Sequence, residues 1–291
     1  MFLVDVILSG LILGGIYALI AMGLSLQYGV ARIMNLAYGE FTIAASFLAY
    51  VMFTVAGVSP ILALAVAMPA SFALNWAIYR VLMTPLVKRA KSPGALEVDS
   101  ILATFGLLFV VQGILLMIFG GSYVSYSYLA VPVQIIGSTV ALNRLLAAGL
   151  AVAIALALTL FLMRTRIGTA IRAVSVNPAA APLVGIDTTA YAAFAFGLGG
   201  ALVAASGVLV SMFFTFNAAM GVVFTMKALI VVIMGGVGNI FGALIAGLIL
   251  GLAESLTAAF LDGGLTLAVN FALFLAILLI RPTGLFGKAA R

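Results

Sequence analysis

The chain contains no cysteine and no histidine among its 291 residues. This absence excludes disulfides, thiolate chemistry, imidazole bases and most transition-metal sites. A Ser-His-Asp triad is impossible without a histidine. The glycine-rich run at 236–242 lacks the Lys and the Ser/Thr of a phosphate-binding loop. The sequence therefore predicts neither an enzyme nor a nucleotide-hydrolysing protein, with no metal site and no directly bound cofactor.

Charge is also scarce, since only 7% of the residues are charged while 66% are hydrophobic. A soluble domain carries roughly 25% charged residues, so this chain cannot cover itself with polar groups, and lipid is the solvent that suits it. In lipid only helices or closed barrels satisfy the hydrogen bonds of the backbone N–H and C=O groups. The apolar stretches here are long and continuous, unlike the short alternating strands of a barrel. The predicted fold is an all-α polytopic membrane protein.

The apolar stretches predict eight or nine transmembrane helices in one domain over residues 1–291. The first lacks the positive end of a cleaved signal peptide and is expected to be retained. The segment 223–234 has about 12 residues where a crossing needs roughly 20, so it either crosses or is re-entrant. Between the fourth and fifth spans, two short β-like runs lie within 123–133. The expected spans are 3–28, 31–57, 60–83, 101–119, 143–163, 190–213, 224–234, 240–260 and 265–280.

The 13 basic residues lie at the ends of the spans rather than in a stripe that would bind nucleic acid. With the N-terminus outside, only Arg144 and Lys227 fall outside or near the outer face. This distribution obeys the positive-inside rule and predicts an external N-terminus and a cytoplasmic C-terminus. The remaining basic residues fall inside, namely Arg32, Arg80, Lys88, Arg89, Lys91, Arg164, Arg166, Arg172, Arg281, Lys288 and Arg291.

A cytoplasmic loop at 164–188 is too apolar for a free linker and too interrupted to span the membrane. Asn177 and Pro178 are a plausible N-cap and first residue of a short helix. Gly185 is placed to end that helix, and Pro182 would kink or shorten it. A short helix on this face suits docking of a soluble partner. The alternative is a basic anchor that contains a helical turn.

Three motifs, in this order and spacing, resemble the permease subunit of bacterial ABC importers for branched-chain amino acids, the LivH-type branch. The resemblance covers nearly the whole chain. The motifs are Gly14-Gly-Ile-Tyr-Ala-Leu-Ile-Ala-Met-Gly-Leu24 with Tyr28-Gly and Asn35-Leu-Ala-Tyr-Gly-Glu40, then Arg166-Ile-Gly-Thr-Ala-Ile-Arg-Ala173 with Asn177-Pro-Ala-Ala-Ala-Pro-Leu-Val-Gly-Ile-Asp187, and Gly235-Gly-Val-Gly-Asn-Ile-Phe-Gly-Ala243 with Gly251-Leu-Ala-Glu254.

The resemblance implies a type II ABC-importer-like permease in the bacterial inner membrane, with 164–188 as the coupling loop on an ATPase. The implied partners are a second related permease, two cytoplasmic ATPase subunits that use ATP and Mg²⁺, and an extracytoplasmic substrate-binding protein. Where the family often has Glu-Ala-Ala and then a polar residue, this chain has three alanines and Pro182. The predicted ATPase-coupling residues are Arg166, Arg172, Asn177, Pro178, Leu183 and Gly185.

Glu40 is the most conspicuous charge, because a helix that began near Ala31 would place it about 13 Å along the axis at 1.5 Å per residue. A carboxylate at this depth is a functional candidate by default, and Gly39 beside it permits close approach. We predict that Asn35, Gly39 and Glu40 belong to the translocation pathway or its gate. The alternative is a structural ion pair with Arg32 or another basic residue.

The glycines at 235–251 favour either close helix crossing or a permease–permease interface, or else a flexible gating turn at Gly235, Gly236 and Gly238. Lys227 and Glu254 are candidates to pair across the bundle. Aromatic and methionine side chains at 212–220 are interpreted as interfacial anchors rather than a substrate box.

The predicted function is the permease subunit of an ATP-driven importer, working by alternating access. The resemblance implies branched-chain or related hydrophobic amino acids as substrates. The alternative is a secondary transporter or channel for small amino acids, amides or urea, driven without ATP. Such proteins place paired carboxylates or broken helices at the midplane, and Glu40 alone gives this alternative little support.

Overall fold

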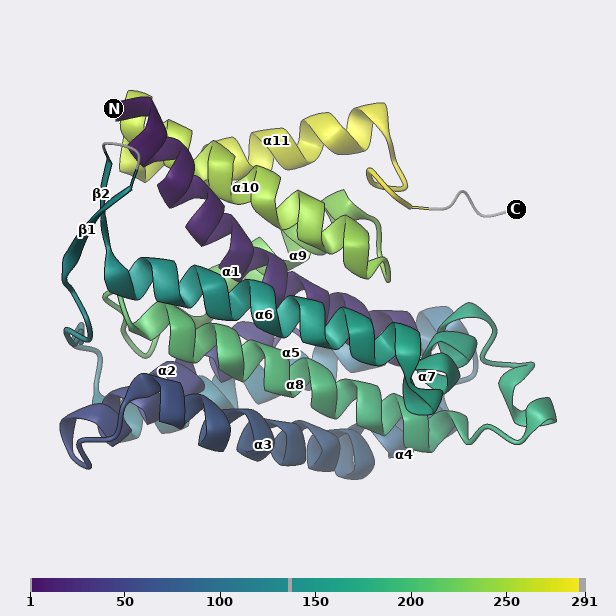
Figure 1. Cartoon of the computed structure of the whole chain (residues 1–291). Coiled ribbons are helices and arrows are strands. Elements are labelled where there is room, and N and C mark those ends of the chain that lie inside the picture. The colour runs from purple at the N-terminus through teal and green to yellow at the C-terminus, as the bar shows by residue number, and fades with distance from the viewer. Residues whose placement is uncertain (1, 136–137, 288–291) are drawn as a thin grey trace.

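The computed structural model of the chain describes residues 2–135 and 138–287, so that Lys288 and Arg291 of the charge distribution lie outside the described residues. Helices make up most of this part (Figure 1). They are α1 (Phe2–Ala31), α2 (Tyr38–Thr54), α3 (Pro60–Ile78), α4 (Thr84–Arg89), α5 (Pro93–Phe119), α6 (Leu142–Arg164), α7 (Arg166–Val176), α8 (Thr188–Ser211), α9 (Gly221–Gly235), α10 (Ile240–Phe260) and α11 (Thr266–Ile280), with a π-helical turn at Tyr79–Met83 and 3₁₀ turns at Ala181–Val184 and Gly263–Leu265.

Seven helical segments among the described residues are long and apolar enough to cross a membrane. In addition, α2 has 17 residues and α9 has 15. At 1.5 Å per residue these two helices are about 26 and 22 Å long, shorter than the ~30 Å hydrocarbon core. The fold is therefore all-α and multi-pass, and the predicted total of eight or nine depends on whether α2 and α9 count as crossings.

The centre of the molecule is α8, which is buried along most of its length. The longest seam joins α1 to α10, where small residues face each other. A Cβ atom on Gly14 would lie 2.8 Å from the Cα of Leu248, and one on Gly247 would lie 2.6 Å from the backbone nitrogen of Ala18. Such spacing lets the helix backbones approach closely in lipid. The close-crossing interpretation of the glycines at 247 and 251 is thus confirmed.

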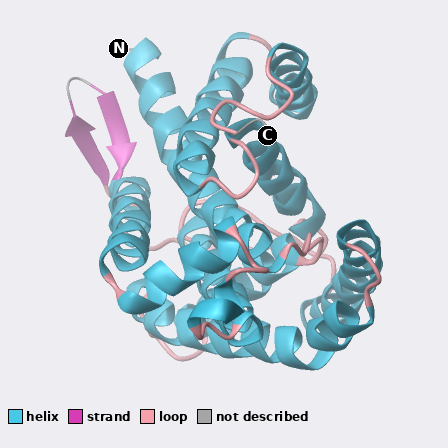
Figure 2. Cartoon of the chain, turned by 90° about the vertical axis from the view of Figure 1, so that its right-hand side faces the viewer, coloured by secondary structure: helices cyan, strands magenta, loops and turns pink. Residues whose placement is uncertain are grey.

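The two ends of the bundle differ in what they carry (Figure 1). The N-terminal end of α1 lies at the same end as an antiparallel hairpin of β1 (Pro132–Ile135) and β2 (Ser138–Ala141). The opposite end carries α7 and the C-terminal ends of α6 and α11. Figure 2 shows that the hairpin stands at the periphery of the helices.

The strands overlap the predicted runs at 123–133 only at residues 132–133, where β1 begins, and otherwise lie later in the chain. Within that segment, Val124 forms an isolated bridge with Phe216. Tyr126 and Tyr128 pack their rings against Phe53 of α2 instead of pairing along a strand. Aromatic packing against α2 therefore holds residues 126–128, and the two strands form after them.

The second predicted span also begins in the wrong place. The first helix continues to Ala31, and residues 32–37 are not helical before α2 starts at Tyr38. Arg32 adopts a left-handed backbone conformation with φ of 55°, which a continuous right-handed helix does not permit. Glu40 therefore lies in the first turn of α2, and the axial depth expected from a helix starting at Ala31 is wrong.

Candidate functional site

The break between α1 and α2 places non-helical backbone inside the bundle. Asn35 is fully buried there. Its Oδ1 accepts a hydrogen bond from the Ala37 amide at 3.1 Å, and its Nδ2 donates to Gln27 Oε1 at 3.3 Å. Gln27 in turn donates to the carbonyl of Phe196 on α8 at 2.8 Å. Side chains thus replace the backbone partners that a helix would have supplied.

Two threonines from other helices complete this support. The Leu36 amide donates to Thr104 Oγ1 of α5 at 3.1 Å. Thr225 Oγ1 of α9 accepts from the Gly39 amide at 2.8 Å and donates to the Leu36 carbonyl at 3.1 Å. Irregular backbone is tolerated at membrane depth when it is buried in protein with its polar groups satisfied. Broken helices of this kind occur at the binding sites of membrane transporters.

Glu40 is fully buried beside this break. Neither carboxyl oxygen has a hydrogen-bond partner among the described residues. The carboxyl group lies directly against Gly221, the first residue of α9, so that it faces the amino ends of both α2 and α9. Helix amino ends favour a negative charge. Glu40 makes no ion pair within the described residues, and the alternative of a structural pair with Arg32 is wrong.

Gly39 serves the contact between α2 and α9. A Cβ atom at this position would lie 2.6 Å from the Thr225 nitrogen, so a larger residue would separate the helices. Asn35, Gly39 and Glu40 therefore lie in one buried region where α1, α2, α8 and α9 meet, and their role in the pathway or its gate stays a prediction.

The other predicted gate residues lie elsewhere, in the turn between α9 and α10. A Cβ atom on Gly235 would lie 2.7 Å from the Ala243 nitrogen. Gly236 and Gly238 have φ values of 99° and 80°, a region that favours glycine. These glycines form a tight turn between the two helices, separate from the buried carboxylate of Glu40.

The segment 164–188 lies at the end of the bundle opposite the hairpin (Figure 1). Its α-helix is α7, which precedes Asn177; the predicted capping by Asn177 is present, but it leads into a turn and a 3₁₀ turn instead of an α-helix. Thr165 caps α7 by accepting from the Gly168 amide at 3.0 Å. Asn177 ends α7, and its Oδ1 accepts from the amides of Ala179 and Ala180. A 3₁₀ turn follows, and Gly185, with φ of 79°, ends it.

Every predicted coupling residue in this segment is exposed, namely Arg166, Arg172, Asn177, Pro178, Leu183 and Gly185. The opposite face of α7 is buried through residues such as Ile171 and Val174. Leu183 is 86% exposed, although it is apolar. The segment is thus attached to the bundle by one face and presents a mixed basic and apolar surface on the other.

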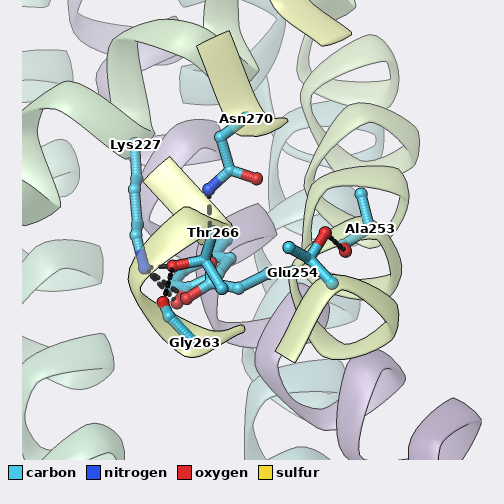
Figure 3. Close-up of polar contacts among 8 residues, drawn as sticks. Lys227, Ala253, Glu254, Gly263, Thr266 and Asn270 are labelled. Atoms are coloured by element: carbon cyan, nitrogen blue, oxygen red, sulfur yellow. Dashed lines mark hydrogen bonds and ion pairs between the residues drawn. The ribbon is translucent and has the colours of Figure 1, made fainter. Parts of the chain in front are cut away.

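The predicted contact between Lys227 and Glu254 is confirmed (Figure 3). Lys227 Nζ lies 2.7 Å from Glu254 Oε1, and it also donates to Tyr17 Oη at 2.7 Å. Asn270 Nδ2 donates to Glu254 Oε2 at 3.4 Å. Lys227 is therefore an interior residue and does not belong to the charge balance at an outer face. Sequence reasoning missed Tyr17 and Asn270, because an isolated Tyr or Asn in an apolar span carries no pairing signal.

Comparison with known proteins agrees with this architecture. The family model described as "Branched-chain amino acid transport system / permease component" matches residues 6–279. The chain belongs to this permease family. It is 32% identical to the high-affinity branched-chain amino acid transport system permease protein LivH of Salmonella typhimurium, over 96% of this chain and 94% of that protein.

Other relatives of this permease extend the same pattern. It is 27% identical to the high-affinity branched-chain amino acid transport system permease protein BraD of Pseudomonas aeruginosa, over 97% of this chain and 95% of that protein. Its fold resembles that of a chain in the structure of PsaBC from Streptococcus pneumoniae in complex with Fab, with a TM-score of 0.53 at 13% identity, covering 98% of this chain and 94% of that chain. The permease is a multi-pass inner-membrane protein and a component of a transport system.

Proposed function

We propose that this chain is the transmembrane subunit of an ATP-binding-cassette importer that moves branched-chain or related hydrophobic amino acids into the cytoplasm by alternating access. Family membership over residues 6–279 supports the transport role. The observation that carries the ATP-driven mechanism is the exposed surface of the segment 164–188, which is anchored to the bundle by the buried face of α7.

The partners in this proposal are a second related permease, two cytoplasmic ATPase subunits and an extracytoplasmic substrate-binding protein. The ATPases use ATP and Mg²⁺, since this chain has no phosphate-binding loop of its own. The N-terminus is external and the C-terminus cytoplasmic. Support comes from the gathering of α7, α4 and the basic end of α6 at the end of the bundle opposite the hairpin (Figure 1).

The coupling path in this proposal runs from α7 to the break between α1 and α2. Arg32 Nη2 lies 3.5 Å from the Ser175 carbonyl of α7, and Arg32 directly precedes the buried segment that contains Asn35. Movement of α7 by an ATPase would act on the residue where α1 ends. The buried Glu40 and the closely packed Gly39 then belong to the part of the pathway that responds, and Gly235, Gly236 and Gly238 form the turn at the same end as α7.

The test is purification of the complex through this subunit, with and without the double change Arg172→Glu and Gly185→Pro. Proline cannot adopt the positive φ of Gly185, and the charge reversal alters the exposed face of α7. We expect ATPase subunits to co-purify with the unsubstituted chain and to be released, or uncoupled from uptake, in the double variant. Arg144→Glu, an exposed charge reversal at the hairpin end, serves as the control and should leave the ATPases bound.

The competing function is a secondary transporter or channel that works without ATP. Reconstituted vesicles that take up substrate on an ion gradient alone, with no ATPase accompanying the protein, would establish that alternative. Uptake that requires ATP inside and binding protein outside would exclude it.

A further inference from the structure

A buried polar cluster lies where α1, α9, α10 and α11 meet (Figure 3), and the coupling path does not use it. Lys227 Nζ donates to both carboxyl oxygens of Glu254, at 2.7 and 2.9 Å, and to Tyr17 Oη at 2.7 Å. Tyr17 is near the midpoint of the 30-residue α1, so the cluster lies at about half the depth of the bundle. Ionisable groups inside a membrane are costly and usually functional.

A cavity of about 40 Å³ adjoins this cluster. Tyr17 and Lys227 supply its polar groups, and the rest of its wall is apolar, including Leu13, Val210 and Phe224. The wall comes from α1, from the C-terminal end of α8, from the start of α9, and from Phe213, Phe214 and Met220, which were predicted to be interfacial anchors and here line the cavity. A small apolar cavity with an ammonium group and a hydroxyl on its wall is complementary to a hydrophobic molecule that carries a carboxylate.

We propose that Lys227 and Glu254 are the membrane-embedded binding site for the charged α-groups of the transported amino acid, an inference that rests on the proposed function. Lys227 receives the α-carboxylate, Glu254 receives the α-ammonium group, and the apolar wall receives the first carbons of the side chain. The amide of Asn270, at 3.4 Å from Glu254 Oε2, keeps that carboxylate in position.

Charge balance favours the step in which Lys227 and Glu254 give up their contact with each other and bind the charged groups of the amino acid. Removing one member of a buried ion pair leaves an uncompensated charge in the membrane, which is strongly destabilising. A zwitterion avoids that cost, because it brings a carboxylate for Lys227 and an ammonium group for Glu254 at the same moment. The present cavity holds a group the size of a carboxylate but not a whole amino acid, so occupation requires α9 and α10 to separate at this contact.

A purely structural ion pair makes a different prediction. Replacement of a whole buried pair by apolar residues is often neutral or stabilising, whereas loss of one partner is costly. A structural pair is therefore dispensable when both charges are removed together. A binding site is not dispensable in this way, because without Lys227 and Glu254 the charges of the substrate enter the membrane without partners.

The experiment compares Lys227→Met, Glu254→Leu and the double variant in the assembled complex, reconstituted in vesicles with saturating leucine-loaded binding protein. Each single variant should melt roughly 10 °C lower than the unsubstituted complex. The double variant should regain the melting temperature while leucine uptake stays roughly 10- to 150-fold lower. Ser255→Ala, which removes a hydrogen bond from α10 to the Val6 carbonyl, is the matched control and should keep normal uptake.

Two further outcomes decide the matter. A double variant that regains both stability and uptake would show that the pair is structural and would overturn the inference alone. If the double variant fails to fold, the exchange Lys227→Glu with Glu254→Lys keeps the pair but reverses the charge at the cavity wall. Uptake by the exchanged variant at the original rate would also overturn the inference. Loss of uptake in the folded exchanged variant would support the inference. Absence of ATP-driven uptake by the unsubstituted complex would refute the proposed function and the inference together.

Discussion

Substitution of Gly39 by alanine tests the contact that holds α2 against α9. An added methyl group would lie 2.6 Å from the Thr225 nitrogen and 2.7 Å from Thr225 Oγ1. Real Cβ atoms do not make such contacts, so the two helices must move apart. The movement also breaks the hydrogen bond of 2.8 Å from the Gly39 amide to Thr225 Oγ1.

The expected loss of stability combines these two effects. Overpacking a tight contact costs about 1–3 kcal/mol, and a buried amide left without its partner costs about 1–3 kcal/mol. A total of about 2–6 kcal/mol corresponds to a fall of roughly 4–24 °C in melting temperature for a domain of this size. The assay is thermal unfolding of the purified complex, followed by the loss of its monodisperse peak in size-exclusion chromatography.

The matched control is Gly149→Ala in α6. A Cβ atom there meets nothing within 4 Å among the described residues, and alanine favours a helix by about 1 kcal/mol over glycine. This variant should melt at the same temperature or slightly higher. If Gly39→Ala had the same melting temperature as Gly149→Ala, the close packing of α2 on α9 would not contribute to stability and the reasoning would be refuted.

Three other expectations follow from the same contacts. Thr225→Val should lower the melting temperature because the Gly39 amide loses its acceptor, at a cost of about 2 kcal/mol, whereas Thr225→Ser should restore it; equal melting of the two variants would contradict this. Asn177→Ala should speed limited proteolysis within 177–185 because the turn loses two hydrogen bonds, and Asn177→Asp should protect it again. Gly247→Ala should destabilise the α1–α10 seam by about 1–3 kcal/mol, and Ala18→Gly in the same chain should not recover that loss, since a Cβ on Gly247 would still lie 2.6 Å from the Ala18 backbone nitrogen; full recovery would argue against contact with the α1 backbone.

The helical fold was predictable because apolar length and scarce charge leave few alternatives in lipid. Helix ends were predictable where a local signal exists, as at Ser59 and Pro60, where the Ser side chain accepts from the Leu62 amide before α3. The end of α1 was not predictable, because Arg32 is a non-glycine residue in a left-handed conformation. Only long-range partners such as Thr104 and Thr225 make that break favourable.

The candidate site was predictable in part. Glu40 was identified because a lone carboxylate in an apolar stretch is costly, and Gly39 because it adjoins Glu40. The approach of Gly221 to that carboxylate depends on the path of the chain between α8 and α9, which leaves no local pattern. The same holds for Tyr17, whose hydroxyl meets Lys227 across 210 residues of sequence.

The seam between α1 and α10 has a consequence for biosynthesis. Ser255 of α10 donates to the Val6 carbonyl of α1, and the two residues are 249 positions apart. At a synthesis rate of about 5–20 residues per second, the ribosome needs roughly 12–50 s to travel that distance. During this time α1 is already available for insertion, while its glycine face, with Gly10 and Gly14, has no α10 to receive it. Lipid or an insertion factor must cover that face until α10 emerges, so the newly made permease is exposed to misassembly and to membrane proteases during most of its synthesis.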